Sequence, residues 1–311
     1  MSDINGSKFQ SAVFLLSGIP GQEHNYLWIS IPFCFMYAVS IVGNSFIVFI
    51  IKTNPSLHEP MYILLSMLAI TDLGLSITTM LTTLRIFLLK SREISHDACF
   101  AQLYFIHTLI CIESSVLLLM GFDRLIAIRD PLRYASILTP QRIAKMWLVC
   151  VLRGVVLNLP LPIFLKQFQY CRANILTRSY CTNGEVMKMA CSDVTINSVY
   201  GLWNALLREG LDSLLILLSY VMILKTVLSI TSRTECLRAL NTCISHLCVV
   251  LAFYTPFLSL TLMHRFGNSP SPSVQIFLGY IYVMFPPLLN PIVYSVKSKQ
   301  LRVRIVGIFV K

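Results

Sequence analysis

Several ionisable side chains stand inside long apolar stretches of the chain, where a charge is costly. They are Asp72, Glu113, Arg153, Arg208, Glu209 and Asp212. A charge within a membrane-crossing helix costs about 3 kcal/mol on insertion scales, so such residues normally face a bundle interior and have a function. A further pair, Asp123–Arg124, closes another apolar stretch in the basic segment "MGFDRLIAIRDPLRY", residues 120–134. These positions are the first candidates for ion pairing, ion binding and switching.

Asp72 and Glu113 could form one acidic site. Glu113 and Arg124 lie 11 residues apart, which is about three helical turns, so they share a helix face. If the helices of Asp72 and Glu113 are neighbours, the two carboxylates meet in the core and repel unless they share a proton or a cation. Two interpretations follow: a bound sodium ion, or a protonated pair held by Ser and Asn neighbours.

The other intramembrane charges have structural interpretations beside functional ones. Arg208 and Asp212 have i,i+4 spacing, which predicts an ion pair within one helix; a ligand contact is the alternative. We expect Arg153 to anchor helix packing rather than to bind a ligand.

A stripe of possible ligand contacts lies near the outer end of the sixth apolar stretch. Tyr254, Leu258, Thr261 and Arg265 follow 4-3-4 spacing and share one helix face. Arg265 stands at the end of the stripe, where a long side chain either reaches water or turns inward. His107 is the other polar candidate at that depth, as a ligand contact or as a hydrogen-bonded core residue.

The elements that carry these residues are membrane spans. Of the 311 residues, 56% are hydrophobic and 13% are charged, whereas soluble domains carry about 25% charged residues. A span needs about 20 predominantly apolar residues. Seven stretches qualify: Leu27–Ile51, Met61–Leu89, Cys99–Ile128, Ile143–Leu165, Ser198–Ile230, Cys236–Met263 and Ser273–Ser295. The predicted fold is an all-α bundle of seven transmembrane helices.

Basic residues set the orientation of this bundle. With the N-terminus outside, the cytoplasmic ends carry 14 of the 25 Lys and Arg residues and only four acids, as the positive-inside rule expects. The net charge of +11 is therefore a topology signal and does not indicate nucleic-acid binding. The chain divides into an extracellular segment 1–26, a seven-helix transmembrane bundle 27–295 with a long outer loop at about 166–197, and a cytoplasmic tail 296–311.

The outer side carries a predicted glycosylation site and four cysteines. Asn5 opens an Asn-Gly-Ser sequon and is a predicted glycosylation site. Four cysteines fall on this side, namely Cys99, Cys171, Cys181 and Cys191. In an oxidising compartment they suggest two disulfides, with three possible pairings.

Several function classes are disfavoured by the sequence. It has no phosphate-cradling Gly-rich loop, zinc-ligand spacing or nucleophile elbow, so we do not expect an enzyme. A transporter would normally carry inverted repeats or broken helices, and neither pattern is visible. A retinal photosensor needs a Schiff-base lysine, but the seventh stretch has none before Lys297, at its cytoplasmic end.

The ordered motifs of the chain resemble those of rhodopsin-like G-protein-coupled receptors, and among these the odorant receptors. They are "GN" (43–44), "LHEPMY" (57–62), "MGFDRLIAIRDPLRY" (120–134), "SY" (219–220), "RALNTCISH" (238–246), "FYTP" (253–256) and "PPLLNPIVYSVKSKQ" (286–300). The long cysteine-bearing loop, "HRFGNS" at 264–269 and His107 resemble the class I, or fish-like, branch. The resemblance covers essentially the whole chain.

This resemblance implies roles for particular residues. It implies disulfides Cys99–Cys181 and Cys171–Cys191, and a sodium-type site at Asp72 and Glu113. It also implies an activation and G-protein-coupling set. That set comprises Asp123, Arg124, Tyr220, His246, Asn290, Pro291 and Tyr294, with Tyr254 at a further position associated with activation.

The ligand implied by the resemblance is a small odorant, and in some class I receptors the arginine matching Arg265 pairs with a ligand carboxylate. His107 and Thr261 match positions that help it. The other ligand-contact candidates are Cys111, Tyr254, Leu258, Asn183 and Gly184. Close acid-binding relatives carry a larger polar pair where Asn183-Gly184 falls, so this departure would enlarge the pocket or weaken acid binding. A lipid or peptide ligand is the alternative within the same fold.

The resemblance also implies partners and a location. The expected partners are a heterotrimeric G protein of the stimulatory, olfactory type, which raises cAMP, membrane lipid and receptor-transporting chaperones. The expected location is the plasma membrane, and no cofactor is expected beyond the sodium ion. Leu125 and Arg129-Asp130 depart from the usual pattern after Asp123–Arg124, which puts the strength of that pair in question.

Overall fold

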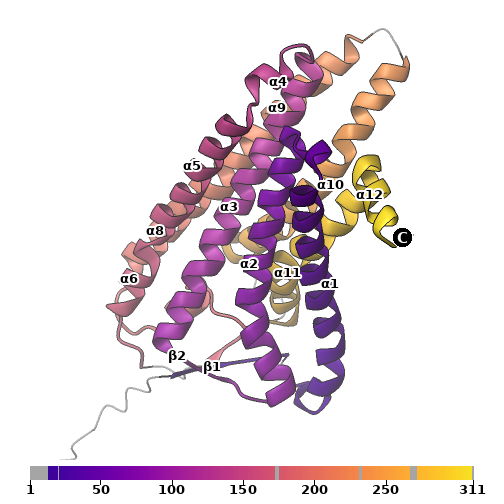
Figure 1. Ribbon diagram of the computed structural model, residues 1–311. Coiled ribbons are helices and arrows are strands. Elements are labelled where there is room, and N and C mark those ends of the chain that lie inside the picture. Colours follow the sequence, from indigo (N-terminus) through magenta and orange to yellow (C-terminus); the bar gives the residue numbers. More distant parts are fainter. Residues whose placement is uncertain (1–12, 20, 172–174, 231–232, 267–271, 310–311) are drawn as a thin grey trace, which may run out of the picture.

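The fold is known from a computed structural model that describes residues 13–19, 21–171, 175–230, 233–266 and 272–309. Within these residues, seven helical segments are long and apolar enough to cross a membrane. They run side by side as one bundle (Figure 1). The predicted all-α architecture is therefore confirmed. The helices are α1 (Tyr26–Thr53), α2 (Pro60–Leu89), α3 (His96–Arg129), α5 with α6 (Pro140–Asn158, Pro160–Lys166), α8 with η3 and α9 (Thr195–Ala205, Leu206–Gly210, Leu211–Leu228), α10 (Arg233–Phe266) and α11 (Pro272–Lys297).

Local sequence signals start several of these helices. Pro60 opens α2 and Pro140 opens α5, at the first helical position, where the missing N–H of proline costs nothing. Ser95 caps α3 by accepting a hydrogen bond from the Ala98 N–H at 3.4 Å, as serine caps commonly do. The short helix η2 (Pro55–Leu57) and α4 (Tyr134–Ile137) connect spans at the inner end.

The core is arranged around α3, the most buried span: 67% of its apolar window is buried, against 28% in the spans built on α5 and α9. Helix α3 packs against α2, α5 and α9. The outward faces of other helices expose large apolar side chains such as Phe35 and Val42. Such faces are expected where hydrocarbon covers the protein.

Two spans differ from the unbroken helices that their apolar stretches predict. The fourth is split between α5 and α6 at Leu159, next to Pro160, because proline cannot donate the backbone bond that would continue the helix. The fifth contains one π-helical turn, η3, between α8 and α9. A π turn holds more residues than an α turn and rotates the side chains that follow it.

The rotation at η3 makes the predicted Arg208–Asp212 pair wrong. Arg208 Nη2 instead lies 2.8 Å from Glu209 Oε1. Asp212 pairs with Arg153 of α5, whose Nη1 lies 2.8 Å from Asp212 Oδ2, and it also accepts from the Ser114 hydroxyl at 2.8 Å. Arg153 therefore does anchor helix packing, by joining α5 to α9.

The segment predicted as a tail forms a further helix, α12 (Lys299–Phe309). It is short and carries several basic residues, so its sequence does not predict a membrane span. Leu301 is fully buried against the bundle, and Arg304 donates to Ser56 at 3.3 Å. The helix turns away from α11 at the inner end (Figure 1).

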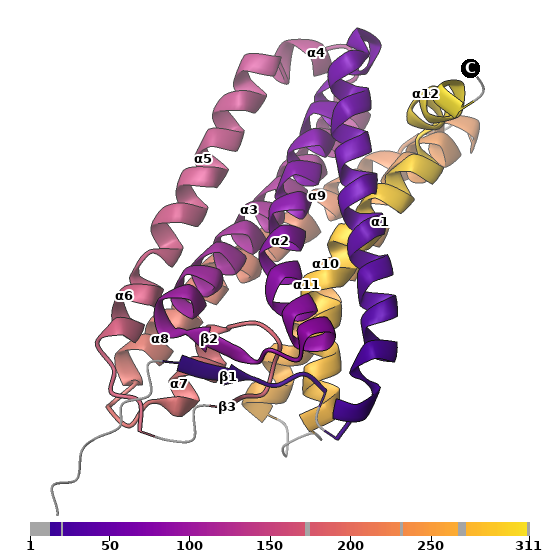
Figure 2. The same cartoon turned by 60° about the horizontal axis from the view of Figure 1, so that its bottom comes forward.

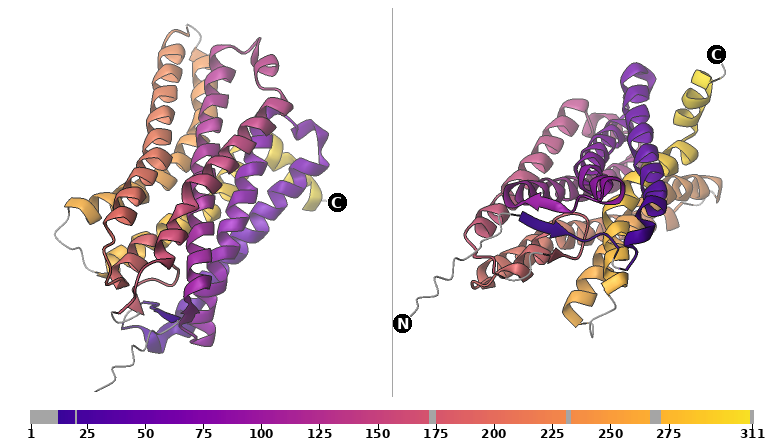
Figure 3. Two further views of the ribbon diagram at one scale, coloured as in Figure 1. Left: turned by 90° about the vertical axis from the view of Figure 1, so that its left-hand side faces the viewer. Right: turned by 90° about the horizontal axis from the view of Figure 1, so that it is seen from below.

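The opposite end, which we call the outer end, is covered by a small sheet. Strand β1 (Val13–Leu16) pairs with β2 (Glu93–Ser95) in antiparallel register and with β3 (Ile175–Leu176) in parallel register. It lies across that end of the bundle (Figures 2 and 3). Phe14 is fully buried and stacks on His96, with ring centroids 4.1 Å apart. Asn5, the predicted glycosylation site, lies outside the described residues.

The second outer loop is ordered by covalent and polar contacts. Disulfides join Cys99 to Cys181 and Cys171 to Cys191, the pairing that the resemblance implies. Its helix α7 (Asn183–Met189) holds Glu185, which accepts hydrogen bonds from Lys188 at 2.7 Å and from the Thr177 hydroxyl. Burial alone would raise the pKa of Glu185, but these bonds outweigh it and lower the pKa below its ordinary value.

The pair Arg153–Asp212 yields a stability prediction. Replacing Asp212 by Asn leaves Arg153 without its counter-charge, and breaking a buried pair in this way costs about 3 kcal/mol. Thermal unfolding of the purified D212N protein in detergent should show a clear fall in Tm. The double variant R153M/D212N should recover much of the loss, because no unpaired charge remains; equal losses in the single and double variants would contradict the assignment.

Candidate functional site

A cavity of about 510 Å³ lies beneath the second outer loop, between α3, α8 with η3, α10 and α11. Its volume is in the range of small-molecule sites. The wall combines apolar side chains such as Ile106 and Leu260 with many polar ones. The polar and glycine residues of the lining are His107, Arg178, Tyr180, Thr182, Asn183, Gly184, Lys188, Ser198, Gly201, Asn204, Arg208, Thr261 and Tyr282.

Four of the predicted ligand contacts line this cavity. His107 comes from α3, Thr261 from α10, and Asn183 and Gly184 from the start of α7. The loop and the two helices are distant in sequence, so the fold is what brings these residues together. The side chain of Arg265 lies outside the part of the chain that the structure describes.

Three other predicted contacts do not line the cavity. The Tyr254 hydroxyl lies 2.8 Å from the Ser114 hydroxyl, in the polar network of the core. Cys111 is fully buried, one turn from His107 along α3. Leu258 is half-exposed on the outside of α10, so the predicted stripe is wrong at that position. The 4-3-4 spacing places the four residues near one helix face but does not fix which edge of that face turns toward the neighbouring helices.

The floor of the cavity holds Arg208, for which the sequence left a ligand contact as the alternative to an ion pair, and its partner is Glu209. Arg208 is 5% exposed, pairs with Glu209 and donates to the His107 carbonyl at 2.9 Å. The Tyr282 hydroxyl of α11 donates to Glu209 at 3.3 Å. The Arg208 Nε and both His107 ring nitrogens are buried without a hydrogen-bond partner. Polar atoms in that condition are normally satisfied by water or ligand.

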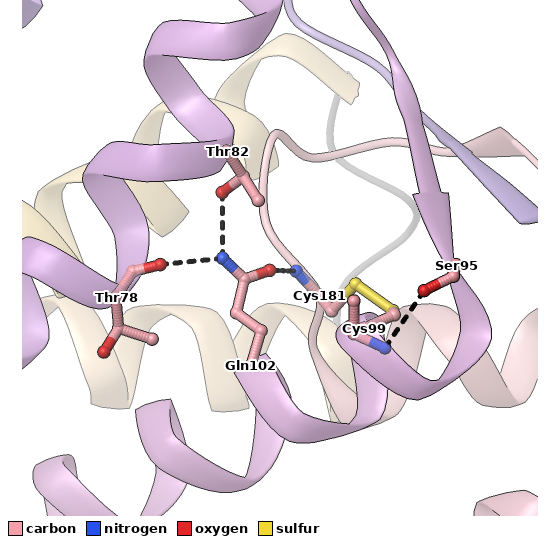
Figure 4. Close-up of a disulfide and its surroundings, with 7 residues drawn as sticks. Thr78, Thr82, Ser95, Cys99, Gln102 and Cys181 are labelled. Carbon is pink, nitrogen blue, oxygen red and sulfur yellow. Dashed lines mark hydrogen bonds between the residues drawn. A yellow bond between two sulfur atoms is a disulfide. The ribbon is translucent and has the colours of Figure 1, made fainter.

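The roof of the cavity is held in place from below. Gln102 of α3 donates to the Thr78 carbonyl at 3.0 Å and to the Thr82 hydroxyl at 2.8 Å, and it accepts from the Cys181 N–H at 3.0 Å. The Cys99–Cys181 disulfide lies beside it (Figure 4). Loop, α2 and α3 are thereby joined at one point, and the loop residues around Cys181 have a defined place over the cavity.

A second polar site lies in the core below the cavity, at Asp72, Glu113 and Asn290. Asn290 donates to Asp72 Oδ2 at 2.8 Å, and all three side chains are buried. Asp72 Oδ1, Asn290 Oδ1 and both Glu113 oxygens are buried without partners. Four oxygens of this site are therefore left without a hydrogen-bond donor. Within the described residues, no three His, Cys, Asp or Glu side chains form a metal-type cluster.

The inner end holds the Asp123–Arg124 pair in a closed arrangement. Arg124 Nε donates to Asp123 Oδ2 at 2.9 Å, and both side chains are buried. The Tyr134 hydroxyl donates to the other Asp123 oxygen at 2.7 Å. The pair borders a space of about 10 Å³, with His246 and Tyr294 on its wall, which admits about one water molecule. No room is left there for a protein partner.

Three of the other predicted switch residues lie around this pair, namely Tyr220, His246 and Tyr294. The Tyr220 hydroxyl lies 2.8 Å from His246 Nδ1, and His246 Nε2 lies 3.0 Å from the Leu117 carbonyl of α3. These contacts tie α9 and α10 to α3. Pro291 of α11 packs closely on Gly43 of α1, where an added Cβ would lie 2.9 Å from the proline ring.

Comparison of the sequence with known proteins identifies the family of this chain. The family model described as "Olfactory receptor" matches residues 33–311. Human olfactory receptor 51G2 is 58% identical over 305 residues, covering 98% of this chain and 97% of that protein. Human olfactory receptor 51A7 is 52% identical over 307 residues, 99% and 97% of the two chains, and mouse olfactory receptor 51E2 is 46% identical over 306 residues, 98% and 96%. The chain therefore belongs to the olfactory receptor family, as a class I, seven-helix G-protein-coupled receptor that crosses the plasma membrane several times.

Proposed function

We propose that this receptor binds a carboxylic acid or a similarly polar small odorant in the outer cavity and raises cAMP through a stimulatory, olfactory-type G protein. The main support for this proposal is the cavity beneath the second loop. It has the volume of a small-molecule site, apolar side chains in its wall, and polar groups at its roof and its floor. An alkyl tail would pack on the apolar wall while the polar head meets the cationic side chains.

Arg265 remains the proposed carboxylate partner in α10, with His107 and Thr261 beside the ligand. A guanidinium presents a planar fork of donors that matches a carboxylate in two parallel hydrogen bonds. Thr261 lines the cavity one helical turn before Arg265, which supports an inward position. Asn183 and Gly184 at the roof leave more room than a larger polar pair would, so the proposed acids include ones with a longer alkyl chain.

The proposed signalling step is the opening of the closed inner end. Arg124 is held by Asp123, and Asp123 is held by Tyr134. An odorant favours the open arrangement only by its differential affinity for that state. Outward movement of α10 would separate His246 from Leu117, release Arg124 and open a cleft for a helix of the G protein. Asn290, Pro291 and Tyr294 would act as the hinge of α11.

Other parts of the proposal concern the surroundings of the bundle. We assign residues 1–26 to the extracellular side, with a glycan at Asn5, and residues 296–311 to the cytoplasmic side. Membrane lipid would cover the exposed apolar faces, and receptor-transporting chaperones would assist delivery to the surface.

Arg265→Ala tests the ligand class. In transfected cells screened for cAMP against short acids, alcohols, aldehydes and ketones, the wild type should respond to acids. The variant should lose at least about tenfold in potency toward them, because a charge-assisted hydrogen bond is lost. Surface expression, measured by an N-terminal epitope tag, should be unchanged. An acid response of normal potency in R265A would remove Arg265 from the pocket.

Arg124→Ala tests the switch. The variant should give no odorant-dependent cAMP, since the group that would contact the G protein is missing. Odorant binding, measured as thermal stabilisation of the purified receptor, should persist. Retention of the cAMP response would refute the role of Arg124.

We also propose that one sodium ion lies between Asp72, Glu113 and Asn290, because carboxylate and amide oxygens are ligands that hard cations prefer. The purified receptor should have a higher Tm in sodium chloride than in choline chloride at equal ionic strength. Asp72→Asn should abolish the difference. Equal Tm values for the wild type in the two salts would favour the protonated pair instead.

A further inference from the structure

The second outer loop carries a buried arginine whose charge no described residue neutralises. Arg178 lines the ligand cavity and is 9% exposed. The arginines within the membrane spans all have carboxylate partners: Arg124 has Asp123, Arg153 has Asp212 and Arg208 has Glu209. For Arg178, the contacts within the described part of the chain are with Tyr180: a hydrogen bond of 3.3 Å to its hydroxyl, and its ring, centred 6.0 Å from the guanidinium carbon.

The guanidinium of Arg178 is held in a fixed place against α11. The Tyr180 hydroxyl that accepts from Arg178 donates in turn to the Gly279 carbonyl at 2.7 Å. A Cβ added at Gly279 would lie 2.5 Å from Arg178 Nη1, so the guanidinium packs directly on this glycine. On the next loop residue, the Ser179 hydroxyl accepts from Tyr280 at 2.7 Å. The Cys99–Cys181 disulfide anchors the end of this segment.

A buried, unpaired charge is costly, and real proteins usually pair it. The second cation at the roof, Lys188, already has Glu185 at 2.7 Å, and Arg208 at the floor already has Glu209. Arg178 is therefore the cation of the described lining whose charge is left for an incoming anion. Because its position is set before the ligand arrives, little ordering is needed on binding.

We propose that Arg178 is the anion anchor of the outer cavity: it pairs with the carboxylate of a small organic acid beneath the second loop, while the alkyl chain extends along Ile106, Phe257 and Leu260. This inference deepens the proposed function and rests on it for the ligand class. It adds a cation from the loop to the one proposed on α10. The selectivity for an acid over its neutral analogue would then depend on the loop as well as on the helices.

The test uses full-length receptor and matched probes: straight-chain carboxylates of four to eight carbons, and the alcohols and methyl esters of the same chain length. Arg178→Gln keeps hydrogen-bonding groups and removes the charge. The potency of the carboxylates in the cAMP assay should fall at least about tenfold, as expected for a lost charge-assisted contact. Responses to the neutral analogues should stay within about twofold on the same scale.

Three further variants make the result specific. Arg178→Lys keeps the charge without the planar fork and should retain part of the carboxylate response. Gly279→Ala should reproduce the loss, because its methyl group displaces the guanidinium. Lys188→Gln, at a lining cation that Glu185 already neutralises, should have a smaller effect on carboxylates than R178Q. Equal losses for acids and neutral analogues in R178Q, or no loss at all, would overturn the proposal.

Binding is measured separately, as the Tm of the purified receptor with and without each carboxylate, since a ligand of the folded state raises its stability. Carboxylates that stabilise wild type but not R178Q, without any cAMP response, would support the anchor and refute the proposed signalling. Carboxylates that raise cAMP equally in wild type and R178Q would leave the proposed function standing and refute the anchor. Carboxylates that neither bind nor signal in wild type would overturn both.

Discussion

The cost of placing a charge in hydrocarbon is the constraint on which this structure depends most. Arg153, Arg208 and Arg124 each lie beside a carboxylate, and the pairs occur at successive levels of the bundle. Removing one partner of such a pair leaves an isolated buried charge, which is far more costly than the pair is favourable. The pairs therefore constrain which helices can be neighbours and how each is rotated. Arg153–Asp212 joins α5 to α9, and Ser114 joins α3 to the same carboxylate.

The same constraint gives the molecule its functional asymmetry. The protein is a receptor and not an enzyme, so it breaks no covalent bond. It acts by changing the noncovalent contacts between its helices. At the inner end the contacts are complete, with Arg124, Asp123 and Tyr134 closing on one another. At the outer end they are incomplete, because His107 and Arg208 have unpartnered nitrogens in the cavity lining. A ligand can supply hydrogen-bond partners to the unpartnered nitrogens at the outer end. At the inner end, the contacts of Arg124 would have to break before it could be released.

Much of this architecture follows from local properties of the chain. The seven spans, the acidic pair Asp72–Glu113 and the Asp123–Arg124 pair are predictable from apolar length and from charges placed within it. The unpredicted parts are short or depend on distant residues. Helix α12 has the sequence of a tail because it is too short and too basic for a span, although Leu301 is buried against the bundle. Leu258 is predicted as a ligand contact from its spacing, but it is half-exposed on the outside of α10. Spacing alone does not say which edge of the stripe faces the neighbouring helices.

What the sequence by itself determined is the inventory: how many helices cross the membrane, which way they run, and which charges must find partners. The tertiary structure decided the partners. Arg208 turns to Glu209 and Asp212 turns to Arg153 because a single π turn changes the phase of the fifth span. Arg178, an ordinary loop residue in the sequence, becomes a buried cation of the cavity because Tyr180, Gly279 and the Cys99–Cys181 disulfide hold it there. Apolar length and charge are properties of a segment, whereas the choice of partner depends on helix rotation and on long-range contacts that no local pattern encodes.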